Sequence, residues 1–307
     1  MNRYFKLNYI ASFLSLFLLL SCSSKDKKNS LKEDNLRGKV KTVIESSYNG
    51  RLYNDVYEKR NLVDQIIKEY DEYGNIITLT KKNAFGFTIN IERSYYDSIH
   101  RLITRDFYNG QSSFNSKSRT NYDENGNIME VVISDYNGHN RGGIKYKCGK
   151  DGNVYSMEVY PDPNDRWRGQ RGGLERMSIT FTYDSKGNKI GEVQVKQDLG
   201  STDFIDYLYD SKGNCLRQVR TNNQKDTLGT VEYDYDKNGN KILEVYRNHN
   251  KYNNYVIRLV NLQYDSNNNL ISYVQTKRNS YNTIDNLTGQ VYTKDGDLIV
   301  ERQITYY

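Results

Sequence analysis

One short motif recurs along most of this 307-residue chain and limits its possible folds more than any other feature. The motif is Tyr-Asp-x-x-Gly-Asn, where x is any residue. It starts at Tyr70, Tyr122, Tyr183, Tyr209 and Tyr235, with degenerate copies at Tyr96, Cys148, Tyr264 and Tyr292 and a half-copy at Tyr57. From Tyr70 onward the spacings between starts are 26, 26, 26, 35, 26, 26, 29 and 28 residues. Such a period predicts a repeat architecture with one supersecondary unit in each copy.

Each copy has the residues of a β-hairpin turn. An aspartate that opens a turn accepts hydrogen bonds from backbone N–H groups two residues later, and glycine adopts positive φ readily. We therefore predict a type I turn followed by a glycine-containing bulge. The flanks alternate as strands do, as in Met177, Ile179 and Phe181 before Tyr183. The position seven residues after each start is apolar or aromatic in all nine copies: Ile77, Ile103, Met129, Tyr155, Ile190, Leu216, Ile242, Ile271 and Ile299.

The predicted fold is all-β, an elongated and twisted antiparallel meander or open solenoid of about nine tandem β-hairpins with a period of about 26 residues. A single hairpin is only marginally stable, so neighbouring hairpins must stack. A closed globular sandwich is the alternative. The 29 tyrosines suit this fold, because we expect each ring to pack across strands while its hydroxyl stays in water. A hydrophobic content of 36% argues against a multi-pass membrane protein, and abundant tyrosine with 2 prolines argues against disorder.

Residues 1–21 have the features of a lipoprotein signal peptide. Arg3 and Lys6 precede an apolar run that ends at Leu20 and is shorter than the roughly 20 residues needed to span a bilayer. The run continues into Ser-Cys and resembles the bacterial lipobox, which makes Cys22 the predicted lipidation site. An ordinary cleaved signal peptide is the alternative. Ser23 resembles the sorting signal for the outer membrane of Gram-negative bacteria.

The rest of the chain divides into a flexible tether at 22–36, an N-terminal capping strand region at 37–56, and hairpin repeats at 57–307. The formal net charge is +6, and removing residues 1–21 takes away two cations and no anions, which leaves +4 (42 minus 38). This mild, dispersed charge gives no indication of nucleic-acid binding.

The tandem motif resembles the YD repeats of rearrangement-hotspot (Rhs) and teneurin-like proteins, and of repeat-bearing lipoproteins of Gram-negative bacteria. The resemblance covers roughly residues 57–307 and depends on one six-residue word in each copy. It implies a β-strand repeat scaffold, often at cell surfaces and sometimes associated with carbohydrate. It implies no catalytic residue.

The residues that commonly carry chemistry are sparse. His100, His139 and His249 lie in expected turns and loops without paired metal-ligand spacing, so we predict no catalytic residue, no metal site and no cofactor. Calcium binding at acidic turns such as the one at Asp123 is an alternative, although turn capping explains the aspartate without a metal. Cys148 and Cys215 are predicted to be free thiols, since four strands at about 4.8 Å each would separate them by about 19 Å.

An insertion near residues 160–174 is the one large break in the period, with nine extra residues. It contains both prolines and the only tryptophan, Trp167, flanked by Arg166, Arg168 and Arg171. Tryptophan and arginine are favoured at interfaces, and the indole could stack on a sugar. These four residues are the predicted binding site. A tolerated loop insertion with a partly buried tryptophan is the alternative.

The leading functional hypothesis is a non-enzymatic, lipid-anchored cell-envelope protein whose sheet surface binds a protein or polysaccharide. The lipid on Cys22 would attach the protein to the outer membrane, at its periplasmic or cell-surface face. One alternative is a structural or assembly component that pairs with another chain through its sheet edge. A second, less favoured alternative is an enzyme.

Overall fold

The computed structural model describes residues 29–110, 113–162, 176–249, 254–279, 283–284, 291–292 and 297–307. The chain divides into two compact units. Among the described residues, unit 1 contains 94–107 and 114–204, and unit 2 contains 29–93, 108–113 and 205–307. The prediction of an all-β fold is confirmed, because the only helical segments described are α2 (Ser30–Glu33) and the short 3-10 helix η1 (Gln197–Leu199).

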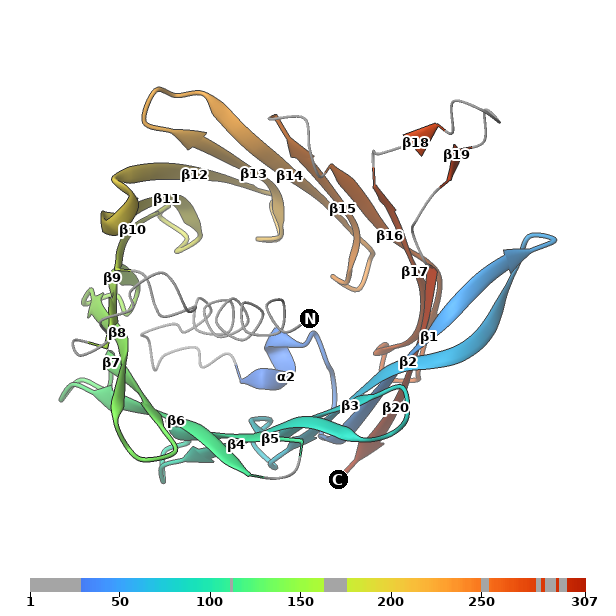
Figure 1. The fold of residues 1–307 in the computed structure, drawn as a ribbon, viewed down its shortest axis with the longest axis horizontal. Helices are drawn as coiled ribbons and strands as arrows, with labels where there is room; N and C mark the ends of the chain where they lie inside the picture. Colours follow the sequence, from blue (N-terminus) through green and yellow to red (C-terminus); the bar gives the residue numbers. More distant parts are fainter. Residues whose placement is uncertain are drawn as a thin grey trace. The chain divides into compact units, whose positions relative to one another are not determined.

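Long strands make up most of each unit (Figure 1). Unit 1 contains most or all of β5 (Leu102–Asn109), β6 (Phe114–Tyr122), β7 (Ile128–Asp135), β8 (Asn140–Cys148), β9 (Val154–Pro161), β10 (Met177–Tyr183) and β11 (Lys189–Lys196). β12 (Ser201–Tyr209) begins in unit 1 and ends in unit 2. Unit 2 contains most or all of β1 (Val40–Tyr53), β2 (Val56–Tyr70), β3 (Ile76–Asn83), β4 (Thr88–Tyr96), β13 (Cys215–Asn222), β14 (Thr227–Tyr235), β15 (Lys241–Asn248), β16 (Tyr255–Tyr264), β17 (Leu270–Asn279) and β20 (Asp297–Tyr306). The short strands β18 (Thr283–Ile284) and β19 (Val291–Tyr292) form a separate two-stranded sheet.

The prediction of an open meander or solenoid is wrong. The long strands belong to one sheet of 18 strands, and the last of them, β20, pairs antiparallel with β17 on one side and with β1 on the other. In β20, Val300 lies opposite Tyr273 of β17 and Ser47 of β1. This pairing joins the end of the strand array to its beginning, so the sheet has the strand pairing of a closed β-barrel. Closure has a physical reason, because an open array would leave two strand edges with unpaired backbone groups.

The predicted hairpin turn is confirmed in detail, as the copy at Tyr183 illustrates. The Asp184 N–H donates to the Asn188 carbonyl at 2.9 Å, and the Gly187 N–H donates to the Asp184 carbonyl at 3.1 Å. Asp184 Oδ1 accepts the N–H groups of Lys186 and Asn188, while Oδ2 accepts the Asn188 side-chain amide. Gly187 has φ +83°, as a type I turn with a glycine bulge requires. We call these connections the motif turns.

The opposite ends of several hairpins use the same chemistry, which the sequence analysis did not predict. The Asp135 N–H donates to the His139 carbonyl at 3.0 Å, and Asp135 Oδ1 accepts the N–H groups of Asn137 and His139. Asn83 and Asn222 cap equivalent turns with their amide oxygens. We call these connections the return turns.

A β-bulge explains the apolar position seven residues after the start of each motif. In β10–β11, Tyr183 lies opposite Lys189 and Thr182 lies opposite Gly191, so Ile190 has no partner. The same skip leaves out Ile77, Met129, Tyr155, Ile242 and Ile271. A bulge strengthens the local twist of a strand pair. The recurring apolar residue therefore marks a repeated change of twist beside each motif turn.

The opening tyrosines hold neighbouring hairpins together, and the expectation that their hydroxyls stay in water is wrong. The Tyr122 hydroxyl donates to the Leu102 carbonyl at 2.8 Å, six residues after the preceding motif start. Tyr183 donates in the same way to Val154 at 2.7 Å, and Tyr235 to Cys215 at 2.9 Å. The contact joins each copy to the one before it, so tyrosine supplies polar as well as apolar stabilisation.

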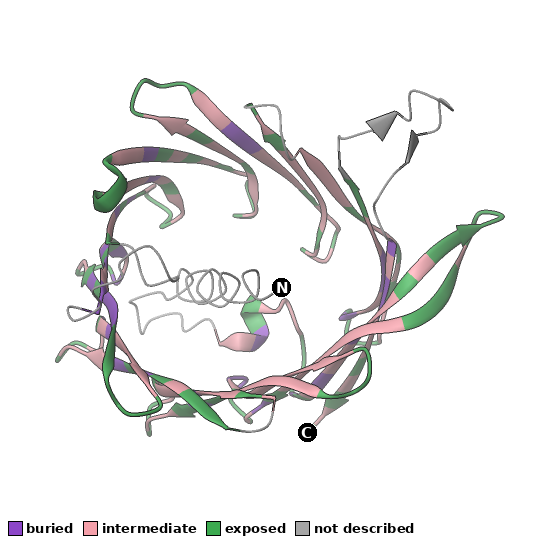
Figure 2. Ribbon diagram, in the orientation of Figure 1, coloured by how far each residue is buried: buried purple, intermediate pink, exposed green. Residues whose placement is uncertain are grey.

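Buried side chains gather in separate clusters within each unit (Figure 2). Unit 1 has one cluster from β7 to β10, which includes Val131, Val159 and Ile179. Unit 2 has one cluster around Val40 and Tyr70 and another around Leu270, Tyr273 and Val300. No helix within the described residues is both long and apolar enough to cross a membrane.

Candidate binding groove

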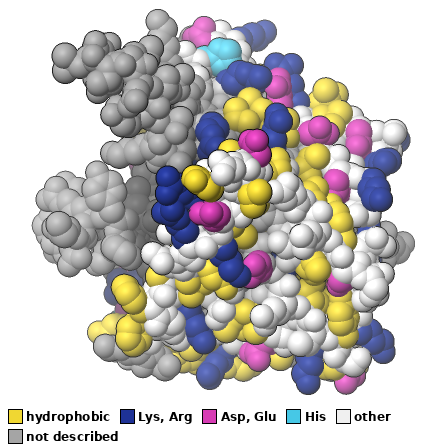
Figure 3. Space-filling model, turned by 90° about the vertical axis from the view of Figure 1, so that its right-hand side faces the viewer, with side chains coloured by type: hydrophobic (Ala, Val, Ile, Leu, Met, Phe, Trp, Pro, Cys, Tyr) yellow, Lys and Arg dark blue, Asp and Glu magenta, His cyan; other side chains and the backbone are white. Residues whose placement is uncertain are grey.

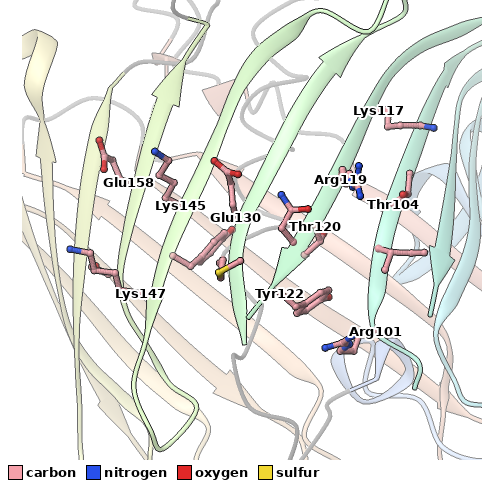
Figure 4. A pocket seen from close by; sticks show the side chains of 15 residues that line it. Arg101, Thr104, Lys117, Arg119, Thr120, Tyr122, Glu130, Lys145, Lys147 and Glu158 are labelled. Carbon is pink, nitrogen blue, oxygen red and sulfur yellow. The ribbon is translucent and has the colours of Figure 1, made fainter. Parts of the chain in front are cut away.

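A groove of about 1110 Å³ lies along five strands of unit 1 (Figure 4). Its walls come from β5 to β9 and from the residues just before β5. Its charged lining residues are Arg101, Lys117, Arg119, Lys145, Lys147, Glu130 and Glu158. Hydroxyl and amide side chains from Thr104, Thr120, Asn121 and Ser156 lie between them, as do the exposed apolar side chains of Ile103 and Met129.

Strand register places opposite charges side by side across the groove. Lys145 of β8 lies opposite Glu130 of β7 and also opposite Glu158 of β9. Side chains of cross-strand pairs lie on the same face of a sheet and attract each other when their charges are opposite. Figure 4 shows these three residues on adjacent strands. The row therefore presents alternating charge to anything that lies along the groove.

A tyrosine connects two members of this row. The Tyr160 hydroxyl donates to Glu130 Oε1 at 2.8 Å, and Lys145 Nζ lies 5.4 Å from the centre of the Tyr160 ring. Burial, together with the nearby Glu130 carboxylate, raises the pKa of Tyr160 well above its usual range. Tyr160 therefore remains a neutral donor that fixes the direction of the glutamate.

Arg101 is held at one end of the groove by two contacts. Its Nε donates to Asp97 Oδ2 at 2.7 Å, and its guanidinium lies 4.5 Å from the centre of the Tyr122 ring. Desolvation acts to raise the pKa of Asp97, but hydrogen bonds from the Arg101 backbone and side chain and from the Ile99 backbone lower it overall. Burial raises the pKa of Tyr122 to about 12. Arg101 is thus pre-positioned, and its charge is already compensated.

Arg119 and Lys147 differ from the other cations of the groove, because within the described part of the chain they have neither an ion pair nor an aromatic ring contact. Arg101 and Lys117 lie 2.7 Å from Asp97 and 3.4 Å from Asp106, and Lys145 lies over the Tyr160 ring. Val132 lies opposite Arg119, and Ser156 lies opposite Lys147. These two cations are therefore the groove residues most available to a negatively charged group of a ligand.

The described lining of the groove consists of charged, hydroxyl, amide, aromatic and apolar side chains. Its described lining has no histidine or cysteine, and no group of three or more potential metal ligands occurs among the residues that the structure describes. The motif-turn aspartates are occupied by their own turns, since Asp123 Oδ1 accepts the Asn127 N–H at 2.7 Å. This occupancy accounts for the acidic turns without calcium.

The predicted site residues Cys22, Arg166, Trp167, Arg168 and Arg171 all lie outside the described residues, so their roles stay predictions. No sequence pattern indicates the groove, because its residues come from five strands and share no motif. The charges of Lys145, Lys147 and Glu158 gave no separate signal, since exposed strand faces commonly carry charge.

The two later cysteines differ from each other. Cys215 is a free thiol, as predicted. At Cys148 the prediction of a free thiol is not confirmed.

The similar proteins that were found are solved structures. No protein-family model matches the chain, and no curated protein matches it. The chain is similar to a porin-like protein from Bacteroides uniformis ATCC 8492, with 11% identity over 87% of this chain and 98% of that chain and a TM-score of 0.44. It is also similar to TcdB2-TccC3 without its hypervariable C-terminal region and to the Photorhabdus luminescens Tc holotoxin pore. Each shares 12% identity over 82% of this chain, with a TM-score of 0.28. The chain spans only 18% and 17% of those two chains.

Proposed function

We propose that this protein is a lipid-anchored component of the bacterial cell envelope that binds a protein or polysaccharide in the groove of unit 1 and catalyses no reaction. The observation that carries the proposal is the groove itself, with charged, hydroxyl and apolar side chains from five strands. Two of its cations, Arg119 and Lys147, have neither an ion pair nor an aromatic ring contact among the described residues. Its strands are held by paired backbones and by the Tyr122 and Tyr183 hydroxyls. A rigid wall loses little conformational entropy when a ligand binds.

The sequence supports attachment through lipid. The lipobox-like ending before Cys22 supports acylation, and Ser23 favours the outer membrane. The face of the molecule in Figure 3 has lysine, arginine and acidic side chains interspersed with hydrophobic ones. A lipid-facing strand surface is instead a continuous apolar band, on which each Lys or Arg costs about 2–4 kcal/mol at the bilayer midplane. The mixed surface thus favours an acyl anchor over strands in contact with lipid.

A charge reversal at the two available cations tests the groove. The double variant Arg119→Glu with Lys147→Glu should lose at least about tenfold in affinity for the ligand that the mature chain selects from a glycan array or by crosslinking in the envelope. Lys150→Glu with Lys186→Glu is the matched control, because it changes the net charge equally on exposed turns of unit 1. Equal losses in both double variants would point to long-range charge and refute a role for the groove.

Cysteine chemistry tests the anchor. Acylation consumes the sulfur of Cys22, so the intact mass of the mature chain should include the acyl chains, and Cys22→Ser should remove them. An intact mass with no added lipid would overturn the anchor.

The β1–β2 hairpin favours a second candidate function, assembly with another chain. Its pairing with β20 ends at Gly50, and β2 pairs with β3 only from Asp64 onward, so among the described residues 51–58 form a two-stranded ribbon beyond their neighbours (Figure 1). Near the tip, Leu52, Tyr53 and Val56 are 49%, 55% and 64% exposed. If assembly is the function, Leu52→Asp with Val56→Asp should abolish envelope crosslinks and leave binding in the groove intact.

A further inference from the structure

The N-terminal segment of the described chain is fastened to a motif turn of unit 2. The Asn29 side-chain amide donates to the Tyr73 carbonyl at 2.7 Å, and the Leu31 N–H donates to the Gly74 carbonyl at 3.1 Å. The Ile76 N–H in turn donates to Ser30 Oγ at 3.1 Å. Leu31 is buried. The chain therefore meets the sheet beside the motif turn at 71–75.

An ionic contact strengthens this attachment. Asp34 Oδ1 lies 2.6 Å from Lys68 Nζ, and Asp34 Oδ2 accepts the Tyr70 hydroxyl at 2.6 Å. Both charged side chains are about three-quarters buried, at 26% and 25% exposure. Burial and the neighbouring Asp34 raise the pKa of Tyr70 well above its usual range, so its hydroxyl remains a donor.

The same segment then crosses to two motif turns that are more than 200 residues away in sequence. The Asn35 amide donates to Asn240 Oδ1 at 2.8 Å. The Arg37 N–H donates to Asn269 Oδ1 at 2.6 Å, and the Asn269 amide donates back to the Arg37 carbonyl at 3.0 Å. Asn269 is fully buried. The segment 29–37 is thus a clip across three motif turns, and it fixes the end of unit 2 at which the chain enters.

Chain length limits the distance from this end to the proposed anchor. Six residues lie between Cys22 and Asn29, and the seven Cα–Cα steps of a fully extended chain reach about 25 Å at most. The eight residues of β3 carry the sheet about 26 Å further, to the return turn at 83–87. The motif-turn end of unit 2 is therefore the end that an anchor at Cys22 holds near a bilayer.

Two exposed tyrosines stand at this end. Tyr73 is 60% exposed and supplies the carbonyl that binds Asn29, while Tyr307 is 50% exposed and donates its hydroxyl to the Tyr70 carbonyl. Tyrosine is enriched where protein meets lipid headgroups, because its ring is apolar and its hydroxyl is polar. We infer that the motif-turn end of unit 2, around Tyr73 and Tyr307, rests on the headgroup surface of a lipid bilayer. The inference depends on the proposed lipid anchor.

Tryptophan quenching by brominated lipid tests this contact. In a Trp167→Phe background, which has no other tryptophan, Tyr73→Trp places a fluorophore at the motif-turn end. Phe85→Trp, at a site 82% exposed in the return turn, is the matched control. In phosphatidylcholine vesicles, replacing the lipid with dibromo-phosphatidylcholine should lower the fluorescence of the lipidated Tyr73→Trp chain about twofold and leave the Phe85→Trp chain unchanged. Equal quenching at both sites, or none at Tyr73→Trp in vesicle-bound protein, would overturn the inference.

Vesicle flotation separates this inference from the anchor. If the native chain floats with vesicles and Cys22→Ser does not, the anchor stands and the quenching pattern decides the inference. If the native chain does not float, the anchor fails, and the chain is attached instead by a histidine tag in place of residues 1–22 to vesicles with a nickel-chelating lipid. Quenching confined to Tyr73→Trp then still supports a headgroup-binding end, and its absence there refutes it.

Discussion

At the scale of the residue, the Tyr-Asp-x-x-Gly-Asn motif makes hydrogen bonds within its own turn and hydrogen bonds to another hairpin. Only those within the turn could be predicted. The Asp184 turn follows from sequence, because its partners Lys186 and Asn188 lie within four residues. The partner of the Tyr183 hydroxyl could not be predicted, since it is the Val154 carbonyl in another hairpin. Local hydrogen bonds are determined by local sequence, whereas bonds between hairpins depend on a register that the repeat does not specify.

Removing a tyrosine hydroxyl should destabilise the fold where the hydroxyl is hydrogen-bonded and not where it is buried and unpaired. The Tyr122 hydroxyl donates to Leu102, while the buried Tyr146 hydroxyl has no hydrogen-bond partner among the residues that the structure describes. A paired hydroxyl contributes about 1 kcal/mol, and an unpaired buried one carries a desolvation penalty of about 1–3 kcal/mol. In urea unfolding, Tyr122→Phe should lower the free energy of unfolding by about 1 kcal/mol, and Tyr146→Phe should leave it unchanged or raise it. A loss at Tyr146→Phe as large as that at Tyr122→Phe would contradict this account.

The turn aspartates should make stability depend on acid pH. Hydrogen bonds from the side chains and backbones of Asn188 and Asn214 lower the pKa values of Asp184 and Asp210 below 3.8. A carboxyl with a depressed folded-state pKa stabilises the fold fully above its unfolded-state value and loses this effect as pH falls through the folded-state value. Melting temperature should therefore be level from about pH 7 to about pH 5 and fall below about pH 4.

The control for this acid dependence keeps the turn geometry and removes the charge. Asn at positions 184 and 210 retains an Oδ1 acceptor for the two N–H groups of each turn. The variant Asp184→Asn with Asp210→Asn should therefore show a smaller fall in melting temperature at acid pH. If the melting temperature of the variant falls at acid pH as steeply as that of the parent chain, the pH dependence comes from other carboxyls.

At the scale of the element, each motif hairpin consists of a turn, a bulge and two strands, and the bulge explains an apolar position that alternation alone does not. Ile190 is skipped in the pairing and remains 40% exposed. The sequence marked the position but not its geometry, because a strand residue and a bulged residue have the same apolar signature. The return turns follow the motif aspartates at a constant distance, since Asn83, Asp135 and Asn222 lie 12 residues after Asp71, Asp123 and Asp210. Their turn chemistry was not predicted because the residues that follow the capping Asp or Asn differ from one turn to the next.

Deleting one bulged residue should harm the hairpin far more than truncating its side chain. Without residue 190, the pairs Tyr183–Lys189 and Thr182–Gly191 become neighbours, so the register is kept but the bulge and its added twist are lost. We expect the Ile190 deletion to lower the urea unfolding midpoint, while Ile190→Ala costs less than about 1 kcal/mol at this partly exposed site. A deletion variant with an unchanged midpoint would show that the bulge does not contribute to stability.

At the scale of the whole molecule, the repeat predicted that neighbouring hairpins pair but could not predict how the array ends. An open and a closed array have the same repeating word, and the difference lies in β20, whose copy of the motif is degenerate. Its residues Ile304 and Gln303 pair with Val43 and Ile44 of β1, about 260 residues away. The repeat did not predict the groove either, since Arg119, Lys147 and Glu158 belong to different strands and come together through strand register.

Breaking β20 should reopen the sheet. Gln303 lies in the interior of this strand and opposite Ile44, and proline there removes a backbone donor and is tolerated poorly in the interior of a sheet. We expect Gln303→Pro to release β20, expose the edges of β1 and β17, and produce concentration-dependent association in sedimentation together with rapid proteolysis near residue 297. Gln303→Ala keeps the backbone donor and should remain monodisperse and resistant. If Gln303→Pro behaves as Gln303→Ala does, the pairing of β20 with β1 is not what closes the sheet.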